Sequence, residues 1–211
     1  MDRVKIKSLA KKQIKGKILT LFALSLIVGL VTGLCSAVPI VGAIASFLIS
    51  SALVLSWSSI YLNIVRKGKT PIVEDLLYGF KSGNFLRAVV GAIYYGLFVF
   101  LWSLLFWIPG IIKAIAYSQM FFLMADDPKL EAADAQKKSM KLMDGHKMEY
   151  FILQLSFFPW FLLILITFGL ASIYVNPYTQ ASYAAFYDAL IAKQSPLKAA
   201  IKAKKTAKAK K

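Results

Sequence analysis

The stretch WIPGIIKAIAYSQMFFLMADDP, residues 107–128, places a Pro-Gly pair and one lysine inside a long apolar run. Residues 88–125 around this pair carry a single charged side chain, that of Lys113. One continuous helix over this run would be about 57 Å long, whereas the hydrocarbon core of a bilayer is about 30 Å thick. The run is therefore too long to cross a membrane once as a straight helix.

Proline lacks an N–H and clashes with the preceding helical turn, so we expect the helix to break at Pro109. Gly110 would let the chain turn tightly. The run then predicts a hairpin of two helices, over 88–108 and 110–125, with Lys113 reaching the outer interface near the tip. The second helix would be only about 24 Å long, so a re-entrant element over the same residues is the alternative.

The whole composition agrees with a membrane protein. Apolar residues make up 58% of the 211 positions, and the 36 charged residues are clustered. Residues 18–65, 88–112 and 150–187 contain no Asp, Glu, Lys or Arg. Uncharged apolar stretches of this length are typical of transmembrane helices and exceed what a soluble domain of this size buries.

Two further runs divide in the same way, at Pro39 and near Pro177. We therefore expect an all-α membrane protein whose helices form three hairpins, with short amphipathic helices on the cytoplasmic side. The polytopic domain covers residues 18–192. Its six expected spans are 18–38, 42–65, 88–108, 110–125, 150–171 and 177–192.

The polar segments predict the orientation. Of the 26 basic residues, seven precede the first span, five lie in 66–87, five in 126–149 and eight after Leu190. Lysine and arginine collect on the cytoplasmic side, so both termini are expected there. Residues 1–17 predict a basic amphipathic segment on the anionic headgroups, and residues 193–211 a disordered Lys/Ala-rich tail.

Small residues recur at every fourth position of the first expected span. Such a stripe lets helix backbones approach closely, which is how membrane helices pack together. Packing against another helix of this chain is the expected use, and self-dimerisation is the alternative. The residues of the stripe are Ser25, Gly29, Gly33 and Ala37.

Three blocks of sequence carry a resemblance to a known family. They are FLWSLLFWIPGIIKAIAYSQMFFLMADDP, KKSMKLMDGHKMEYFILQLSFFPW and NPYTQASYAAFYDAL, in that order along the chain. Together they resemble the bacterial integral-membrane family catalogued as domain of unknown function 975. The resemblance covers most of residues 5–190 and implies a multi-spanning bacterial membrane protein. It brings no catalytic residues with it.

No pattern of catalytic, cofactor-binding or metal-ligating residues stands out. There is one histidine, His146, and one cysteine, Cys35, so a Cys/His metal site is not expected. Asp126 and Asp127 could form a carboxylate pair, but helix capping explains Asp127 without catalysis. A nucleic-acid partner is not expected either, because the basic residues flank apolar segments instead of forming a recognition element. The chain is predicted to be no enzyme and to need no cofactor.

Polar residues inside the apolar runs are the candidates for ligand contact. We expect an accessory or scaffold protein that acts on the cytoplasmic side through membrane lipids or a membrane protein partner. The alternative is a transporter or channel for a lipid or small solute that uses the broken helix at Pro109 and Gly110. The candidate ligand-contacting residues are Lys113, Gln119, Gln154, Gln180 and Asp188.

Overall fold

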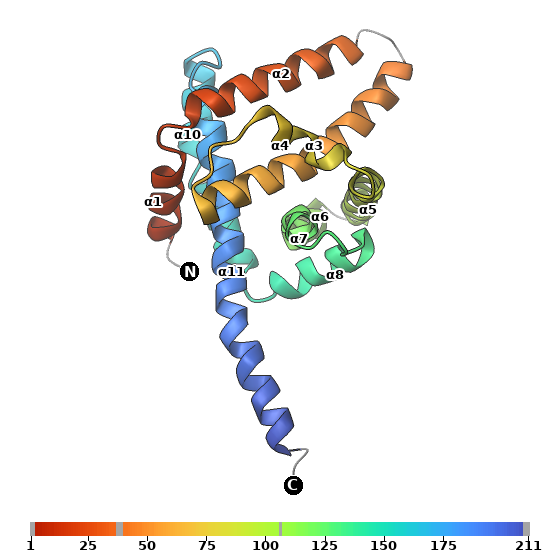
Figure 1. Ribbon diagram of the computed structural model, residues 1–211, viewed down its shortest axis with the longest axis vertical. Coiled ribbons are helices and arrows are strands. Elements are labelled where there is room, and N and C mark those ends of the chain that lie inside the picture. The colour runs from red at the N-terminus through yellow and green to blue at the C-terminus, as the bar shows by residue number, and fades with distance from the viewer. Residues whose placement is uncertain (1–2, 37–39, 106, 209–211) are drawn as a thin grey trace.

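The computed structural model describes residues 3–36, 40–105 and 107–208, which form helices joined by turns (Figure 1). The α-helices are α1 (Arg3–Ile14), α2 (Ile18–Ser36), α3 (Val41–Lys67), α4 (Val73–Leu76), α5 (Asn84–Leu105), α6 (Trp107–Tyr117), α7 (Met120–Asp126), α8 (Ala132–Leu142), α9 (Lys147–Leu155), α10 (Phe158–Ile166) and α11 (Ser172–Lys208). A short 3₁₀ helix, η1 (Leu77–Phe80), follows α4.

Three antiparallel helix pairs surround the centre of the molecule. Helices α2 and α3 form one pair, α5 packs along α6 as the second, and α10 returns into α11 as the third (Figure 1). Helix α11 also contacts α1, α2 and α3, and α8 closes over α5, α6 and α7. The main core lies where α11 meets these neighbours, around Ile64, Phe157 and Tyr187.

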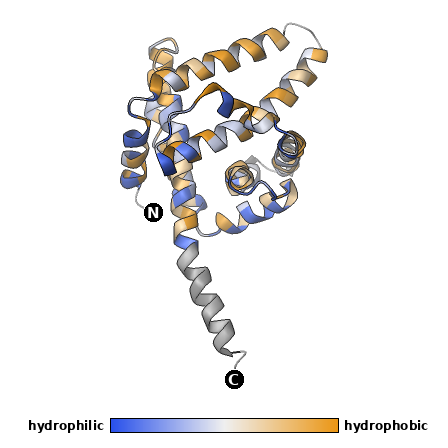
Figure 2. Cartoon of the chain, in the orientation of Figure 1, coloured by the Kyte–Doolittle hydropathy of each residue, from blue (hydrophilic) through white to orange (hydrophobic). Residues whose placement is uncertain are grey.

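Five segments are long and apolar enough to cross a membrane, as Figure 2 shows by their colour. They match the first five expected spans closely at most of their ends. The N-terminal part of α11, where residues 177–192 were expected to form a sixth span, is not among them. The five segments are Ile18–Cys35, Val41–Lys67, Asn84–Leu104, Ile108–Asp126 and Lys147–Ile166.

The predicted separation into two helices is present but lies just before Pro109, since α5 ends at Leu105 and α6 begins at Trp107. Helix α6 begins at Trp107 and continues through Pro109 and Gly110. Proline is tolerated there because the first N–H groups of a helix have no intrahelical acceptor. Gly110 is buried and serves close packing instead of a turn: a Cβ on it would lie 2.2 Å from the Oγ of Ser103 in α5.

The segment that follows is itself interrupted at Ser118 and Gln119, between α6 and α7. Ser139 of α8 stabilises this interruption. Its hydroxyl donates to the carbonyl of Ala116 at 2.7 Å and accepts the backbone N–H of Gln119 at 3.2 Å. A buried serine from another helix thus pairs two backbone groups that the break would leave unsatisfied.

The last hairpin turns earlier than predicted. The turn occupies Thr167–Ala171, where Gly169 has a φ of 91°, a conformation that glycine adopts without strain. Helix α11 then runs without interruption through Pro177, so the expected bend there is wrong. Pro39, expected to mark the first hairpin turn, lies outside the described residues.

The small-residue stripe of α2 does not pack against another described helix of this chain. Ser25, Gly29 and Gly33 are exposed, and a Cβ built on either glycine meets no described atom within 4 Å. The expected packing is therefore wrong for these three positions. Ala37 lies outside the described residues.

Both ends of the described chain are helical. Helix α1 buries Ile6, Ala10 and Ile14 against the bundle, so it docks on protein along this face. The backbone of 193–208 continues α11, which agrees with the helix propensity of alanine and lysine, and the disorder expected for 193–211 stays a prediction.

The connection after α3 docks on that helix. Ser56 of α3 donates to the carbonyl of Leu76 at 2.7 Å and accepts the N–H of Gly79 at 2.8 Å. A Cβ on Gly79 would lie 1.9 Å from the carbonyl oxygen of Ala52, so only glycine fits at this contact. Nearby Ile72, Val73 and Leu77 remain exposed.

Candidate functional site

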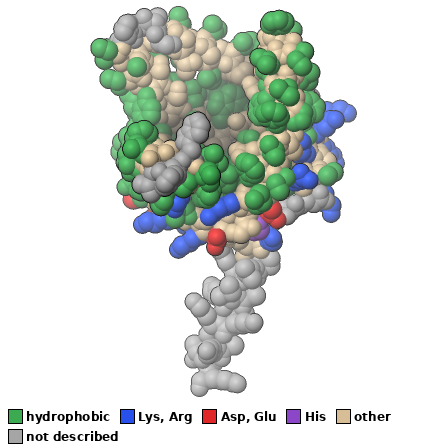
Figure 3. Space-filling view, turned by 180° about the vertical axis from the view of Figure 1, so that it is seen from behind, with side chains coloured by type: hydrophobic (Ala, Val, Ile, Leu, Met, Phe, Trp, Pro, Cys, Tyr) green, Lys and Arg blue, Asp and Glu red, His purple; other side chains and the backbone are tan. Residues whose placement is uncertain are grey.

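A cavity of about 980 Å³ lies between the three helix pairs. It is lined from α2, α3, α5, α6, α7, α9 and α11, so every hairpin contributes to it. The face seen in Figure 3 is hollowed, with hydrophobic side chains around the hollow and Lys and Arg along the lower edge of the molecule. This volume is at the upper end of the range for small-molecule pockets.

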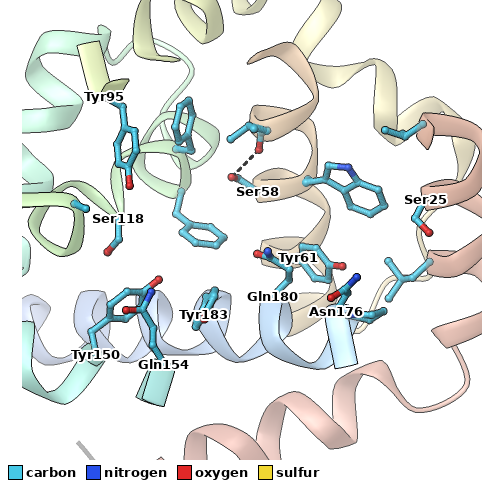
Figure 4. A pocket seen from close by; sticks show the side chains of 18 of the residues that line it. Ser25, Ser58, Tyr61, Tyr95, Ser118, Tyr150, Gln154, Asn176, Gln180 and Tyr183 are labelled. Carbon is cyan, nitrogen blue, oxygen red and sulfur yellow. Dashed lines mark hydrogen bonds between the residues drawn. The ribbon is translucent and has the colours of Figure 1, made fainter. Parts of the chain in front are cut away.

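Neutral polar side chains point into the cavity (Figure 4). They include hydroxyls of serine and tyrosine and the amides of two predicted candidates, Gln154 and Gln180. Among the described lining residues none is Asp, Glu, Lys, Arg or His. The neutral polar lining labelled in the figure consists of Ser25, Ser58, Tyr61, Tyr95, Ser118, Tyr150, Gln154, Asn176, Gln180 and Tyr183.

The polar and apolar parts of the lining come mainly from different elements. Helices α9 and α11 supply most of the amides and tyrosines, among them Gln154, Asn176 and Gln180. Helices α2 and α6 supply mainly hydrocarbon, for example Leu21 and Ile111. The amides are therefore gathered on α9 and α11, whereas α2 and α6 contribute one polar lining residue, Ser25, beside their apolar ones.

The break between α6 and α7 borders this cavity. Ser118 lines it, and its Oγ accepts a 2.8 Å hydrogen bond from the Nε2 of Gln119. Gln119 itself is fully buried, and its Oε1 has no hydrogen-bond partner among the described residues. The predicted candidate Gln119 is therefore hydrogen-bonded to a residue that lines the cavity, Ser118.

A charged network joins the ends of three helices beyond the cavity. Arg66 of α3 makes a forked contact with Asp126 of α7 and donates from Nε to Asp188 of α11 at 2.6 Å. The hydroxyl of Tyr187 donates to Asp126 at 3.0 Å. The ring of Tyr187 stacks on Phe122, which lines the cavity, with 5.6 Å between centroids. One aromatic layer therefore separates the cavity from the network.

Two of the predicted ligand-contacting residues lie away from the cavity. Asp188 is held by Arg66, so it belongs to the charged network. Lys113 lies with its Nζ 4.4 Å from the ring centroid of Trp102 and borders a small groove with Lys141 and Asp144. The structure thus brings together Gln154 and Gln180 and separates them from Lys113 and Asp188.

Sequence reasoning missed Arg66 and the cavity tyrosines, although a signal for Arg66 exists. Arg66, Asp126 and Asp188 are each the charged residue that follows an apolar run. The second of these runs also contains one charged residue, Lys113, in its interior. The structure brings these three residues of α3, α7 and α11 together, where the opposite charges pair.

A second interrupted helix is stabilised by the N-terminal segment. Helices α9 and α10 are separated by a turn at Ser156 and Phe157. The Nζ of Lys7 donates to the carbonyl and the Oγ of Ser156 and lies 4.2 Å from the ring centroid of Phe157. Burial, helped by the charge of Arg3, lowers the pKa of Lys7.

The acidic residues and the histidine that were not expected to be catalytic have structural partners. Asp126 is paired with Arg66, and the Nδ1 of His146 lies 2.7 Å from the Oε2 of Glu149. Asp127 does not cap a helix as expected; it forms a turn with the N–H of Lys129, and α8 begins only at Ala132. Within the described ranges no three His, Cys, Asp or Glu side chains gather as a metal site.

Comparison with known proteins identifies the family. No curated protein and no solved structure matches the chain. A family model described as "Protein of unknown function (DUF975)" matches residues 1–116 and 104–194. These two matches cover most of the sequence and confirm the resemblance found in its motifs. The chain therefore belongs to the DUF975 family.

Proposed function

We propose that this protein is a six-span membrane protein that binds a small amphipathic molecule in its central cavity. The observation that carries the proposal is the cavity itself, which combines the amides of α9 and α11 with mainly apolar side chains from α2 and α6. Such a cavity suits a transporter or lipid-handling protein better than a pure scaffold, because a scaffold needs no cavity of this size. We propose no enzymatic activity and no cofactor.

The orientation completes the proposal. The basic segments 1–17, 66–87 and 126–149 would face anionic headgroups of the cytoplasmic leaflet of a bacterial plasma membrane. The first part of α11 would form the sixth span, packed inside the bundle, which explains its weaker hydropathy. The three hairpin turns would then lie on the outer side, and both termini inside.

An accessory role through lipid or protein partners is the second candidate. It is favoured by one observation, the gathering of Lys and Arg along one edge of the molecule while the rest of that face is hydrophobic (Figure 3). This edge would meet lipid headgroups or an acidic partner without involving the cavity. The two candidates therefore predict different sensitivities to changes in the cavity.

Native mass spectrometry of protein released in mild detergent tests the first candidate. Wild type is compared with Ala114→Phe, which places a ring in the cavity, and with Ala43→Phe on an exposed position of α3. We expect a small molecule retained by wild type and Ala43→Phe and lost from Ala114→Phe. Retention of a partner protein by all three, with no small molecule in any, would favour the accessory role.

A further inference from the structure

The lining of the cavity restricts the kind of molecule that fits it. No charged side chain is found among the described lining residues. Moving an ion from water into such a site without a partner of opposite charge is strongly unfavourable. A phosphate headgroup or a carboxylate would find no cation here, and an ammonium group no carboxylate. The occupant is therefore expected to carry no net charge in the part that enters the cavity.

The polar side chains of the lining indicate hydroxyl groups on that occupant. Tyrosine and serine hydroxyls and the amides of Gln154, Gln180 and Asn176 each offer both donors and acceptors. Pro177, which also lines the cavity, has no N–H for the carbonyl of Ile173, so this carbonyl lacks its usual helical donor. A ligand with hydroxyl groups matches this lining because a hydroxyl also donates and accepts.

The side chains that α2 and α6 contribute indicate hydrocarbon. Helices α2 and α6 line the cavity with leucine, isoleucine, phenylalanine and alanine side chains such as Phe22 and Ala114. The surface around the hollow is hydrophobic as well, and α2 and α5 bury little of their apolar span within the protein (Figure 3). In a bilayer this rim would open to acyl chains instead of to water.

Taken together, and resting on the proposed ligand-binding function, these features lead us to infer that the occupant is an uncharged lipid with a hydroxylated headgroup. Diacylglycerol and glycosylated diacylglycerols are of this chemical class. The headgroup lies against α9 and α11, at Gln154 and Gln180, and the acyl chains lie against α2 and α6. The aromatic pair Phe122 and Tyr187 closes the cavity toward the charged network.

Competition in lipid nanodiscs tests this assignment. Wild-type protein is loaded with a fluorescent dioleoylglycerol and challenged with unlabelled dioleoylglycerol, phosphatidylglycerol, phosphatidylcholine or free glycerol. We expect dioleoylglycerol to compete at least tenfold better than either phospholipid, and glycerol not to compete. Gln154→Leu and Gln180→Leu should each weaken binding about threefold to tenfold, the effect of one lost neutral hydrogen bond.

A change of charge sharpens the test. Gln154→Lys supplies the missing cation, so we expect it to reverse the preference toward phosphatidylglycerol. Gln180→Lys repeats this from α11 if the first variant is not folded. Ala43→Phe serves as the control outside the cavity and should bind as wild type does.

The possible failures are distinct. Equal or stronger competition by phosphatidylglycerol or phosphatidylcholine in wild type, abolished by Ala114→Phe, would overturn the uncharged class and leave the cavity as a binding site. Competition by free glycerol would overturn the lipid assignment in the same way. Absence of any lipid or solute binding would overturn the proposed function as well.

Discussion

Arg66 donates a 2.6 Å hydrogen bond to Asp188, which lies 122 positions later in the chain, and holds Asp126 with its other nitrogens. These contacts tie the returning helices of all three hairpins together at one end. Because two carboxylates share one guanidinium, the geometry depends on the planar fork that arginine alone presents. The network therefore closes the bundle on the side of the basic segments.

Replacing Arg66 by lysine should destabilise the protein. Lysine keeps the charge but cannot reach both carboxylates with a fork, so we expect a loss of about 1–3 kcal/mol. Thermal unfolding in detergent, followed by circular dichroism, measures this loss. Lys137→Ala is the control, since its pairing with Asp134 is exposed and 3.8 Å long and should contribute below about 1 kcal/mol. Equal effects of both variants would contradict a structural role of the network.

Ser139→Ala should loosen the break between α6 and α7. The change leaves the carbonyl of Ala116 and the N–H of Gln119 without their partner, and each buried unsatisfied group costs about 1–3 kcal/mol. We expect a lower unfolding temperature and faster amide hydrogen exchange at Gln119. Ser50→Ala, at an exposed position of α3, is the matched control and should leave both unchanged. Unaltered exchange at Gln119 in Ser139→Ala would argue against this stabilisation.

Two glycine-to-alanine changes should act in opposite directions. At Gly110 an added Cβ would meet Ser103 of α5, including its Cα at 2.9 Å, and overpacking of this kind costs about 1–3 kcal/mol. At Gly96 the same Cβ meets no described atom within 4 Å, so the higher helix propensity of alanine should stabilise by up to about 1 kcal/mol. Unfolding temperatures of the two variants check the signs. A stabilised Gly110→Ala protein would show that α5 and α6 are not closely packed there.

The proposed orientation predicts which loops a membrane-impermeant thiol reagent reaches in intact cells. In a Cys35→Ser background, a cysteine introduced at Phe168, which is 99% exposed, should be labelled from outside. Cysteines introduced at Ser82 and Asp144, both exposed in polar connections, should be labelled only after the cells are opened. Labelling of Asp144→Cys in intact cells would instead support the re-entrant alternative for residues 110–125.

The sequence predicted that the long apolar runs are interrupted better than it predicted the positions of the interruptions. Proline signalled an interruption at Pro109 and Pro177, yet both residues lie within helices. The interruption at Ser118 carries no proline, whereas the one at Ser156 comes just before Pro159 in the first turn of α10. Each is held by a polar group from a distant helix, Ser139 or Lys7. A local sequence pattern indicates how unfavourable a residue is inside a helix. It does not indicate the polar partners of these interruptions, because those come from tertiary contacts.

The glycines of the chain show the same limit. Gly29 and Gly33 follow a packing motif but meet no other described helix within 4 Å, while Gly79 and Gly110, outside any motif, mark the close contacts. Of the predicted ligand-contacting residues, Gln154 and Gln180 line the cavity, whereas Lys113 and Asp188 lie away from it. Spacing places a residue on a helix face, but only the neighbouring helix decides what that face meets.

By itself the sequence determined the all-helical class, the positions of five apolar segments, the basic connections and the family. These follow from composition and from the length of uncharged runs, which are properties of contiguous residues. The tertiary structure alone decided that Gln154 and Gln180 share a cavity with the tyrosines, and that Arg66 pairs with Asp126 and Asp188. Such groupings depend on how three hairpins pack, because packing joins residues that the chain keeps far apart.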